Sequence, residues 1–261
     1  MKRLVLPEGL SRYTVTSGLD VRMVINQNAE TLIELNAEED MECTWEIRVL
    51  SGVKATVFFL NQALGNVVSK IRVYAEKDAV LKVGVLEFGK AAHTLNAKID
   101  LEGEGAVSEF HTAALANARL SYDIETEHKA RYTEGYMKNY GLVVSEIPWT
   151  IVCAGKINRG AKGSKSRQES RILTFGKPEN IKVLPILYID ENDVEASHAN
   201  SIGQPEAEAM YYMESRGLDR KEVIGLLSAG YILPAADLFE DTSMSAYLRN
   251  LIQKKVKEWE Q

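Results

Sequence analysis

The chain is poor in cysteine, histidine and proline, and it has no long apolar run. Its 261 residues include 2 cysteines, 4 histidines and 6 prolines. Cys43 and Cys153 form no Cys-x-x-Cys pair, which argues against a disulfide framework and favours a reducing compartment. No stretch approaches the ~20 apolar residues of a membrane span, and the N-terminal MKRLVLPEGL lacks the apolar core of a secretory signal. These absences predict a soluble, cytoplasmic protein.

An excess of positive charge is also missing, because the formal net charge is −6. Phosphate backbones need a positive surface, so we expect no nucleic-acid partner. The basic run 156–171 has no interleaved aromatic residues for base stacking and is predicted to be a solvated strand-and-turn face. Residues 84–91 (GVLEFGKA) come within one residue of a phosphate-binding loop, but Ala91 replaces the required Ser or Thr and the segment continues a strand.

Apolar and polar residues alternate over short runs from about residue 13 to residue 198, which is typical of half-buried strands. The clearest runs are 44–50, 80–88, 97–103 and 122–128. Glycine and asparagine separate these runs, and prolines such as Pro185 are expected at strand ends. Strand-bearing segments recur at roughly twenty residues from about Ile99 onward, which suits a β-solenoid but also leaves a sandwich or barrel open.

The sequence period changes to a helical one after Pro205, which suits a first helical position. A second helix begins at Asp219, where Glu222 completes a capping-box pattern, and is expected to stop at Gly230. Its apolar stripe is Val223, Ile224, Leu226 and Leu227. A last helix carries apolar residues at helical spacing, which on general grounds pack against the rest of the protein: Tyr247, Leu248, Leu251, Ile252, Val256 and Trp259.

The histidines show no spacing typical of a structural zinc site. They are His93, His111, His128 and His198. A β-solenoid with acidic clusters at 38–40 and 190–193 also admits a carbohydrate-active enzyme as a minor alternative, although exposed acidic turns are far commoner.

Three segments in order resemble the core signature of the SufB/SufD family. They are residues 185–203 (PILYIDENDVEASHANSIG), an acidic helix with Tyr-Tyr-Met, and Ser215-Arg216-Gly217-Leu218. This family belongs to the SUF system of iron–sulfur cluster assembly. Similar upstream elements are Glu127-His128-Lys129-Ala130, Gly155-Lys156-Ile157, Gly160-Ala161 and Gln168. The resemblance covers about residues 100–235 and fades before residue 100.

This resemblance implies a mainly β protein: a right-handed parallel β-helix over residues 1–200 and a helical docking segment over residues 201–261. It also implies that the chain is not an enzyme. A SufC-like ABC-type ATPase would bind the helical segment and hydrolyse ATP, and a second copy or a SufB/SufD paralogue would pair with the β-helix. The residues expected to contact the ATPase are Arg216, Gly217, Leu218, Val223, Ile224 and Leu227.

His198 matches the family histidine at the paired-subunit interface, so the resemblance implies that it helps to build a transient iron–sulfur cluster shared between subunits. A neutral imidazole can ligate iron and exchange protons near neutral pH. The alternative from the residues alone is a corner histidine at the strand-to-helix junction. Whether a flavin binds is left open.

The chain departs from the SufB pattern at two places and is closer to SufD there. Glu179 occupies the position of a SufB cysteine, and Ser197 and Ala199 flank the histidine where SufB has acidic residues. Thiolates are the usual ligands of iron–sulfur clusters, so His198 is expected to need ligands from a partner. Cys153 is expected to be buried core. A purely structural subunit of the ATPase complex that handles no cluster is the alternative function.

Overall fold

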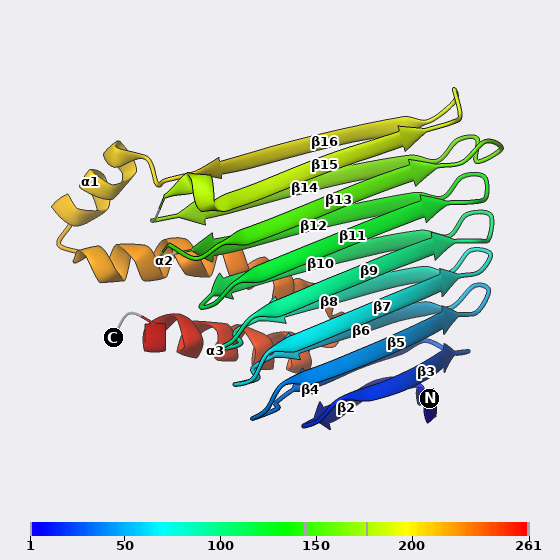
Figure 1. Cartoon of the computed structure of the whole chain (residues 1–261), viewed down its shortest axis with the longest axis horizontal. Coiled ribbons are helices and arrows are strands. Elements are labelled where there is room, and N and C mark those ends of the chain that lie inside the picture. The colour runs from blue at the N-terminus through cyan, green and yellow to red at the C-terminus, as the bar shows by residue number, and fades with distance from the viewer. Residues whose placement is uncertain (1, 144–145, 176, 260–261) are drawn as a thin grey trace.

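The computed structural model describes residues 2–143, 146–175 and 177–259. The chain winds into a parallel β-solenoid whose coils each contribute one strand to each of two facing eight-stranded sheets (Figure 1). The strands of the first sheet, called the odd sheet, are β1 (Lys2–Val5), β3 (Leu19–Ile25), β5 (Met41–Val49), β7 (Val67–Ala75), β9 (His93–Leu101), β11 (Leu120–His128), β13 (Trp149–Ile157) and β15 (Ile181–Ile189).

The second sheet, called the even sheet, pairs strands of the alternate set in the same parallel manner. Its strands are β2 (Gly9–Val15), β4 (Ala29–Leu35), β6 (Lys54–Asn61), β8 (Val80–Glu87), β10 (Val107–Ala116), β12 (Glu134–Val143), β14 (Lys165–Thr174) and β16 (Glu195–Gly203). The mainly β solenoid with C-terminal helices is therefore confirmed, and the coils start well before residue 100.

The coils become longer along the chain, and those after Ile99 are longer than the sequence suggested. Lys2 pairs with Val21 in the first coil, whereas Ile99 pairs with Thr126 in the middle of the stack. Trp149 pairs with Ile181 near the last coil, which is the widest of these three separations. The predicted spacing from Ile99 onward was therefore too short, because each of these coils holds two long strands, such as β9 and β10, and two corners.

Alternation within each strand separates a solvent-facing side from an interior side. β5 alternates buried and partly exposed residues along its whole length, and its inward residues join one continuous apolar core between the sheets. Cys153 lies in this core as expected, and Cys43 does too. Burial raises the pKa of the Cys153 thiol to about 12, so both position and protonation keep it unreactive.

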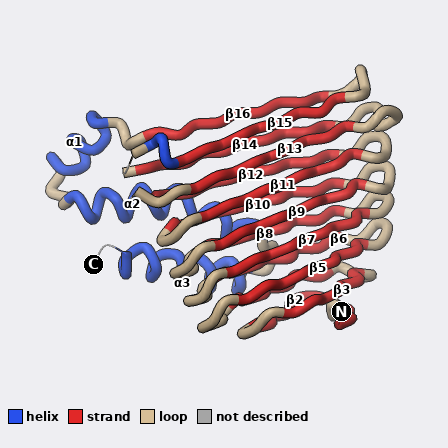
Figure 2. Tube along the Cα trace, in the orientation of Figure 1, coloured by secondary structure: helices blue, strands red, loops and turns tan. Residues whose placement is uncertain are grey.

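The helices follow the last strand; all but the first of them cover one outer face of the solenoid, and the first projects beyond the ends of the strands (Figure 2). They are α1 (Ala207–Ser215), α2 (Arg220–Ile232), the 3₁₀ helix η2 (Leu233–Leu238) and α3 (Thr242–Trp259), with a short η1 (Pro178–Asn180) before β15. A second apolar cluster joins α2, η2 and α3 to outward residues of the even sheet, among them Leu32, Phe58 and Leu142. The apolar faces of the last two helices therefore pack against the protein's own sheet.

Gly84 shows how closely this layer packs. A Cβ there would lie 2.2 Å from the Phe58 ring and 3.0 Å from Leu238 of η2. Gly84 belongs to strand β8 rather than to a turning loop. This agrees with the rejection of a phosphate-binding loop at residues 84–91.

The predicted ends of two helices were wrong by a few residues. α1 begins at Ala207 rather than at Pro205, because Glu206 still has extended dihedral angles. α2 passes through Gly230 to Ile232. Ile232 is completely buried, and this packing outweighs the ~1 kcal/mol helix penalty of glycine. The capping box of Asp219 and Glu222 is present as predicted.

α3 is attached to the first coils of the solenoid by polar contacts. The Glu30 carboxylate of β4 accepts hydrogen bonds from the backbone N–H groups of Glu240 and Asp241, at 2.8 and 2.9 Å. Arg12 donates to both Glu34 and the Tyr247 hydroxyl. Leu248, Ile252 and Val256 are buried as the stripe predicted, whereas the Trp259 side chain lies outside the described part. The last helix thus spans back to the beginning of the chain.

Candidate functional site at the open end of the solenoid

The last coil of the solenoid leaves two strand edges open. β15 pairs only with β13, and β16 only with β14, within the described residues. Figure 1 shows these two strands at one end of the stack, opposite the N-terminal coils. Several apolar side chains remain exposed on β15, namely Leu184 (50%), Tyr188 (53%) and Ile189 (38%). An exposed apolar edge of this kind is typical of a surface that another chain covers.

Pro185 lies in the middle of β15 rather than at a strand end, so that expectation was wrong. A proline has no backbone N–H for a ladder, and the open edge is where a strand tolerates it. Strand extension at this position would lack one hydrogen bond.

His198 lies in the middle of β16 and not at the strand-to-helix junction. β16 continues to Gly203 because its pairing with β14 continues to that residue. In this register His198 is opposite Gln168, a buried residue that faces the solenoid interior. Ile202, further along the same face of the strand, packs against the interior core, which fixes the same inward direction for alternate residues.

His198 is exposed because no further coil covers it. It forms the last step of an inward column whose earlier members are Phe110, Met137 and Gln168. A shallow groove of about 380 Å³ crosses β12, β14 and β16 at the same level. The imidazole is therefore accessible at the open cross-section of the solenoid.

The other expected or candidate ligands do not gather around His198. Glu179 is exposed in η1, which precedes the start of β15. The segment that leads into β16 follows the other end of β15. Cys153 is buried one coil below the open end, where Asn139 donates to its sulfur and Pro185 lies opposite it in the register. Within the described residues, no group of three or more His, Cys, Asp or Glu side chains is arranged to hold a metal ion.

His128 differs from His198 in its burial. It is completely buried and its Nδ1 contacts the Thr133 hydroxyl at 2.8 Å. Burial lowers the pKa of His128 to about 4. It is a neutral core residue at physiological pH.

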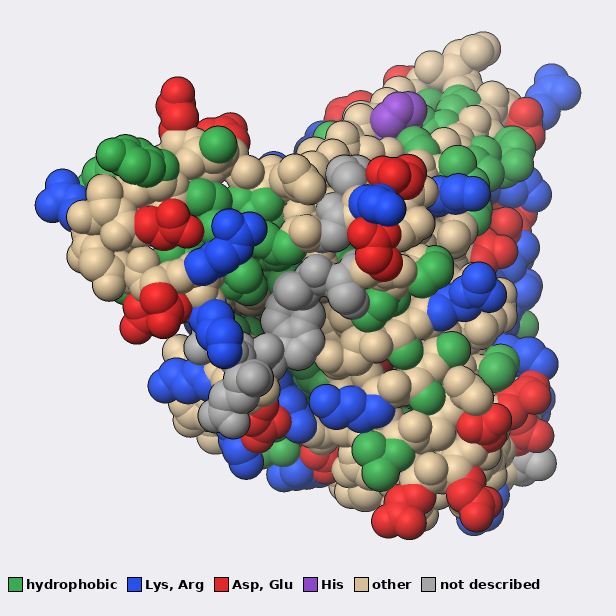
Figure 3. All heavy atoms as spheres, turned by 60° about the vertical axis from the view of Figure 1, so that its left-hand side comes forward, with side chains coloured by type: hydrophobic (Ala, Val, Ile, Leu, Met, Phe, Trp, Pro, Cys, Tyr) green, Lys and Arg blue, Asp and Glu red, His purple; other side chains and the backbone are tan. Residues whose placement is uncertain are grey.

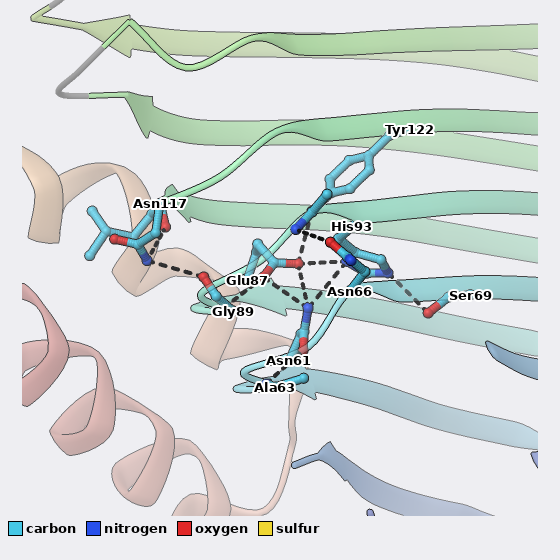
Figure 4. A network of polar contacts seen from close by, with 11 residues as sticks. Asn61, Ala63, Asn66, Ser69, Glu87, Gly89, His93, Asn117 and Tyr122 are labelled. Atoms are coloured by element: carbon cyan, nitrogen blue, oxygen red, sulfur yellow. Dashed lines mark hydrogen bonds and ion pairs between the residues drawn. The ribbon is translucent and has the colours of Figure 1, made fainter. Parts of the chain in front are cut away.

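A buried polar network lies at the corner between β8 and β9 and was not foreseen from the sequence (Figure 4). The Glu87 carboxylate accepts hydrogen bonds from Asn61, the Gly89 backbone and Tyr122 and contacts His93 Nδ1 at 2.5 Å. His93 Nε2 in turn lies 2.9 Å from Ser69 Oγ.

The order Glu87–His93–Ser69 resembles that of a nucleophilic triad. However, all three residues are at most 3% exposed, so no substrate reaches the hydroxyl. Burial, followed by the Glu87 charge, raises the pKa of Tyr122 well above its usual value. The network is therefore structural.

A second charged cluster lies on the outside of the odd sheet and contains two of the motif positions. Glu127 contacts Lys98 at 3.1 Å and Lys156 at 3.0 Å, and it accepts a hydrogen bond from Asn158. Partial burial opposes ionisation of Glu127, but these donors outweigh it and lower its pKa to about 2. The Glu127 and Lys156 motif residues thus tie neighbouring coils together.

The acidic segment 190–193 has structural partners of its own. The Glu191 carboxylate accepts a hydrogen bond from the Gly160 backbone, and Asp193 contacts Lys162 at 3.3 Å. These acids stabilise the turns between coils. The structure thus gives no support to a sugar-binding role for this segment.

The helical segment presents only part of the expected ATPase-contacting set. Arg216 is exposed and stacks over the Tyr212 ring, and Gly217 adopts φ +93°, a left-handed conformation that favours glycine at a helix end. Leu218, Ile224 and Leu227 are partly buried, and Val223 is completely buried. Val223 faces the protein's own core in this conformation.

Exposed apolar residues of the same helices were missing from that set. Tyr211 (74%), Tyr212 (59%) and Leu226 (56%) are the most exposed of them. Figure 3 shows apolar side chains among charged ones on the projecting helical part. A hollow of about 290 Å³ lies between α1, the start of α2 and Phe175. Leu226 belongs to the apolar stripe expected from the sequence, and only the packing of α2 shows that it stays exposed while Val223 is buried.

The chain is thus a parallel β-solenoid protein with an open last coil and a helical layer on one face. The model of the SUF system FeS cluster assembly, SufBD core domain, matches residues 20–231 of the chain. The chain belongs to this SufBD core-domain family, which confirms the resemblance drawn from the motifs.

Named relatives point the same way. The chain is 29% identical to the iron–sulfur cluster assembly protein SufD of Bacillus subtilis over 160 residues, which is 60% of this chain and 37% of the relative. It is 25% identical to the SufBD family protein ycf24 of Guillardia theta over 64% of this chain and 35% of the relative. A chloroplastic SufBD family protein of Arabidopsis thaliana, ABCI8, is 20% identical over 56% of this chain and 27% of the relative. The chain thus spans about a third of the length of these relatives. Among the described residues, no helix has the length and apolarity to cross a membrane.

Proposed function

We propose that the chain is a scaffold subunit for iron–sulfur cluster assembly in which His198 offers a ligand to a transient cluster at the open end of the solenoid. The cluster is cargo rather than a resident cofactor. The observation that carries this proposal is the position of His198: it is accessible, inward-facing and on the terminal strand of a SufBD-family solenoid. An imidazole there can be shared with ligands from a second subunit.

The second subunit in this proposal is another copy of the chain or a SufB/SufD paralogue. Support comes from the open edges of β15 and β16 and from the exposed Leu184 and Tyr188 beside them. One imidazole is a weak site for a cluster, since clusters are held mainly by thiolates. Both cysteines are buried, so the remaining ligands come from the partner.

The helical segment is proposed to bind a SufC-like ABC-type ATPase, which hydrolyses ATP while this chain performs no catalysis. The exposed surface of α1 and α2, with Tyr211, Tyr212, Arg216 and Leu226, is the most suitable docking surface. Deletion of the whole segment is a poor test. It would uncover Phe58, Leu142 and their apolar neighbours on the even sheet.

The second candidate function is an interaction subunit that binds the ATPase and handles no cluster. It is favoured by the lack of a multi-ligand metal group among the described residues and by the buried thiols. The two candidates differ in one respect only, namely whether His198 is needed for cluster formation.

Anaerobic reconstitution of the full complex with ferrous iron and sulfide, followed by absorbance spectroscopy, tests the proposal. His198→Ala is expected to lower cluster formation at least tenfold while leaving folding and subunit pairing intact, because the residue is exposed. The matched control is Asn200→Ala, an exposed residue on the same strand and the same face. His128→Ala is unsuitable, because it would open a cavity in the core. Equal cluster formation in the His198 and Asn200 variants would establish the interaction subunit instead.

A further inference from the structure

The side-chain amide of Gln168 has a hydrogen-bond partner for its nitrogen but none for its oxygen among the described residues. It is 3% exposed and its Nε2 donates to the Ile186 carbonyl of β15 at 2.8 Å. This bond across the interior sets the orientation of the amide. The Oε1 atom is buried and has no hydrogen-bond partner among the described residues. Buried polar atoms nearly always have a partner, and leaving one unpaired costs stability.

The polarity of Gln168 is not explained by the column in which it lies. The two preceding members, Phe110 and Met137, are apolar and completely or almost completely buried. A methionine or leucine would continue this column. The next member in register is His198, on a strand about 4.8 Å away.

The outward-facing neighbours of Gln168 on β14 cannot donate a hydrogen bond to its Oε1. Arg167 and Glu169 alternate with Gln168 and therefore face the other side of the even sheet. Arg167 is paired with Glu195, and Glu169 with Arg171, at 3.0 and 2.6 Å. His198 is the donor-bearing side chain directly above Gln168 in the inward column.

We propose that Gln168 is the positioning residue for His198: rotation of the exposed imidazole brings one ring N–H into a hydrogen bond with Oε1, the buried acceptor that has no partner among the described residues. A neutral imidazole has one N–H and one lone pair, so this bond fixes the tautomer. The other ring nitrogen then keeps its lone pair and faces the open end of the solenoid as a ligand for iron. Histidines that bind metals generally donate their second nitrogen to such an acceptor. This inference rests on the proposed function of His198.

The test is the tautomeric state of His198 in the full-length chain, measured from the ¹⁵N chemical shifts of the imidazole and assigned with His198→Ala. The neutral ring is expected to be predominantly one tautomer. Gln168→Met introduces the same side chain as Met137, the preceding member of the inward column. This variant is expected to give a mixture of both tautomers. Ser166→Ala is the control. It removes a buried polar group from the same face of β14, but the residue opposite it is Ala196, which has no polar side chain.

A wild-type ring with the tautomer mixture of free imidazole would overturn the inference without any variant. So would an unchanged tautomer in Gln168→Met. In the reconstituted complex, Gln168→Met is expected to lower cluster affinity ten- to a hundredfold. If His198→Ala leaves cluster formation unchanged, the proposed function fails. If His198→Ala abolishes it but Gln168→Met changes neither tautomer nor affinity, only the role of Gln168 fails.

Discussion

At the scale of single residues, the carboxylate of Glu87 is costly to bury, because it is taken almost completely out of water. It is 1% exposed and takes part in contacts with Asn61, the Gly89 backbone, Tyr122 and His93. Taking charges out of water is repaid only when partners satisfy them almost completely. The network is therefore expected to be strongly coupled.

Glu87→Leu and His93→Leu should each lower the free energy of unfolding by about 3–5 kcal/mol, because each leaves a buried polar partner behind. The double variant should lose clearly less than the sum of the two. Urea denaturation followed by circular dichroism measures all three. Glu46→Gln breaks the exposed Arg22–Glu46 pair and serves as control, with an expected loss below about 1 kcal/mol. Additive losses in the double variant would contradict the coupling.

Glu127 predicts a dependence of stability on acid pH. Its pKa is lowered from 4.5 to about 2 in the folded protein, so the unfolded chain binds its proton first. The stabilisation is thus complete above about pH 4.5 and is lost as the pH falls toward 2. Glu127→Gln should flatten the loss of thermal stability between these pH values. His128, whose pKa is lowered from 6.5 to about 4, contributes in the same direction between those values. A Glu127→Gln profile parallel to that of the wild type would contradict this assignment.

At the scale of elements, the helical segment has one face packed against the even sheet and one face exposed to solvent. Leu248 of α3 is completely buried against the even sheet, whereas Leu226 of α2 is 56% exposed. The two leucines lie on helices of the same segment, yet they are expected to report on different properties.

Leu248→Ala should lower the free energy of unfolding by about 2–5 kcal/mol, and Leu226→Ala by no more than about 0.5 kcal/mol. Under the proposed function, Leu226→Ala and Tyr211→Ala should weaken binding of the ATPase subunit, measured by isothermal titration calorimetry. Exposed Leu64 on the solenoid, at 59%, provides the control Leu64→Ala, which should bind normally. Undiminished ATPase binding by both helix variants would remove the docking surface from α1 and α2.

At the scale of the whole molecule, the described part of the solenoid has two open ends, and His198 lies at one of them. The last coil exposes Leu184 and Tyr188, and the first exposes Leu10 at 40%. Among the described residues the outer strand edges are unpaired at both ends, so edge pairing alone does not decide which end a second subunit uses.

Leu184→Glu is expected to weaken pairing with the second subunit at least tenfold, because it places a charge on the apolar edge of β15. Leu10→Glu makes the same change at the opposite end and should leave pairing intact. Analytical ultracentrifugation of the subunit complex measures both. If Leu10→Glu is the disruptive variant, the partner occupies the N-terminal end and His198 is not at the interface.

Local properties of this protein followed from its sequence alone. The two-residue alternation predicts strands because side chains of a strand point to opposite faces, and its loss at Pro205 predicts helices. Asp219 and Glu222 specify a helix start by contacts within one turn. The burial of Cys153 follows from its place in an alternating strand. The family signature was also readable, because its motifs occur in order along the chain.

Everything that depends on register between coils needed the tertiary structure. Asn61 and Glu87 meet because they are paired across neighbouring coils, and no local pattern shows that pairing. The same holds for Gln168 beneath His198, which are a full coil apart in the sequence. The sequence placed His198 at a hinge, but the pairing with β14 extends β16 beyond it to Gly203. The sequence also put Val223 on a docking face, whereas tertiary packing buries it completely. Alternation predicts that a side chain points inward or outward, but only the winding of the solenoid decides which side chains become neighbours.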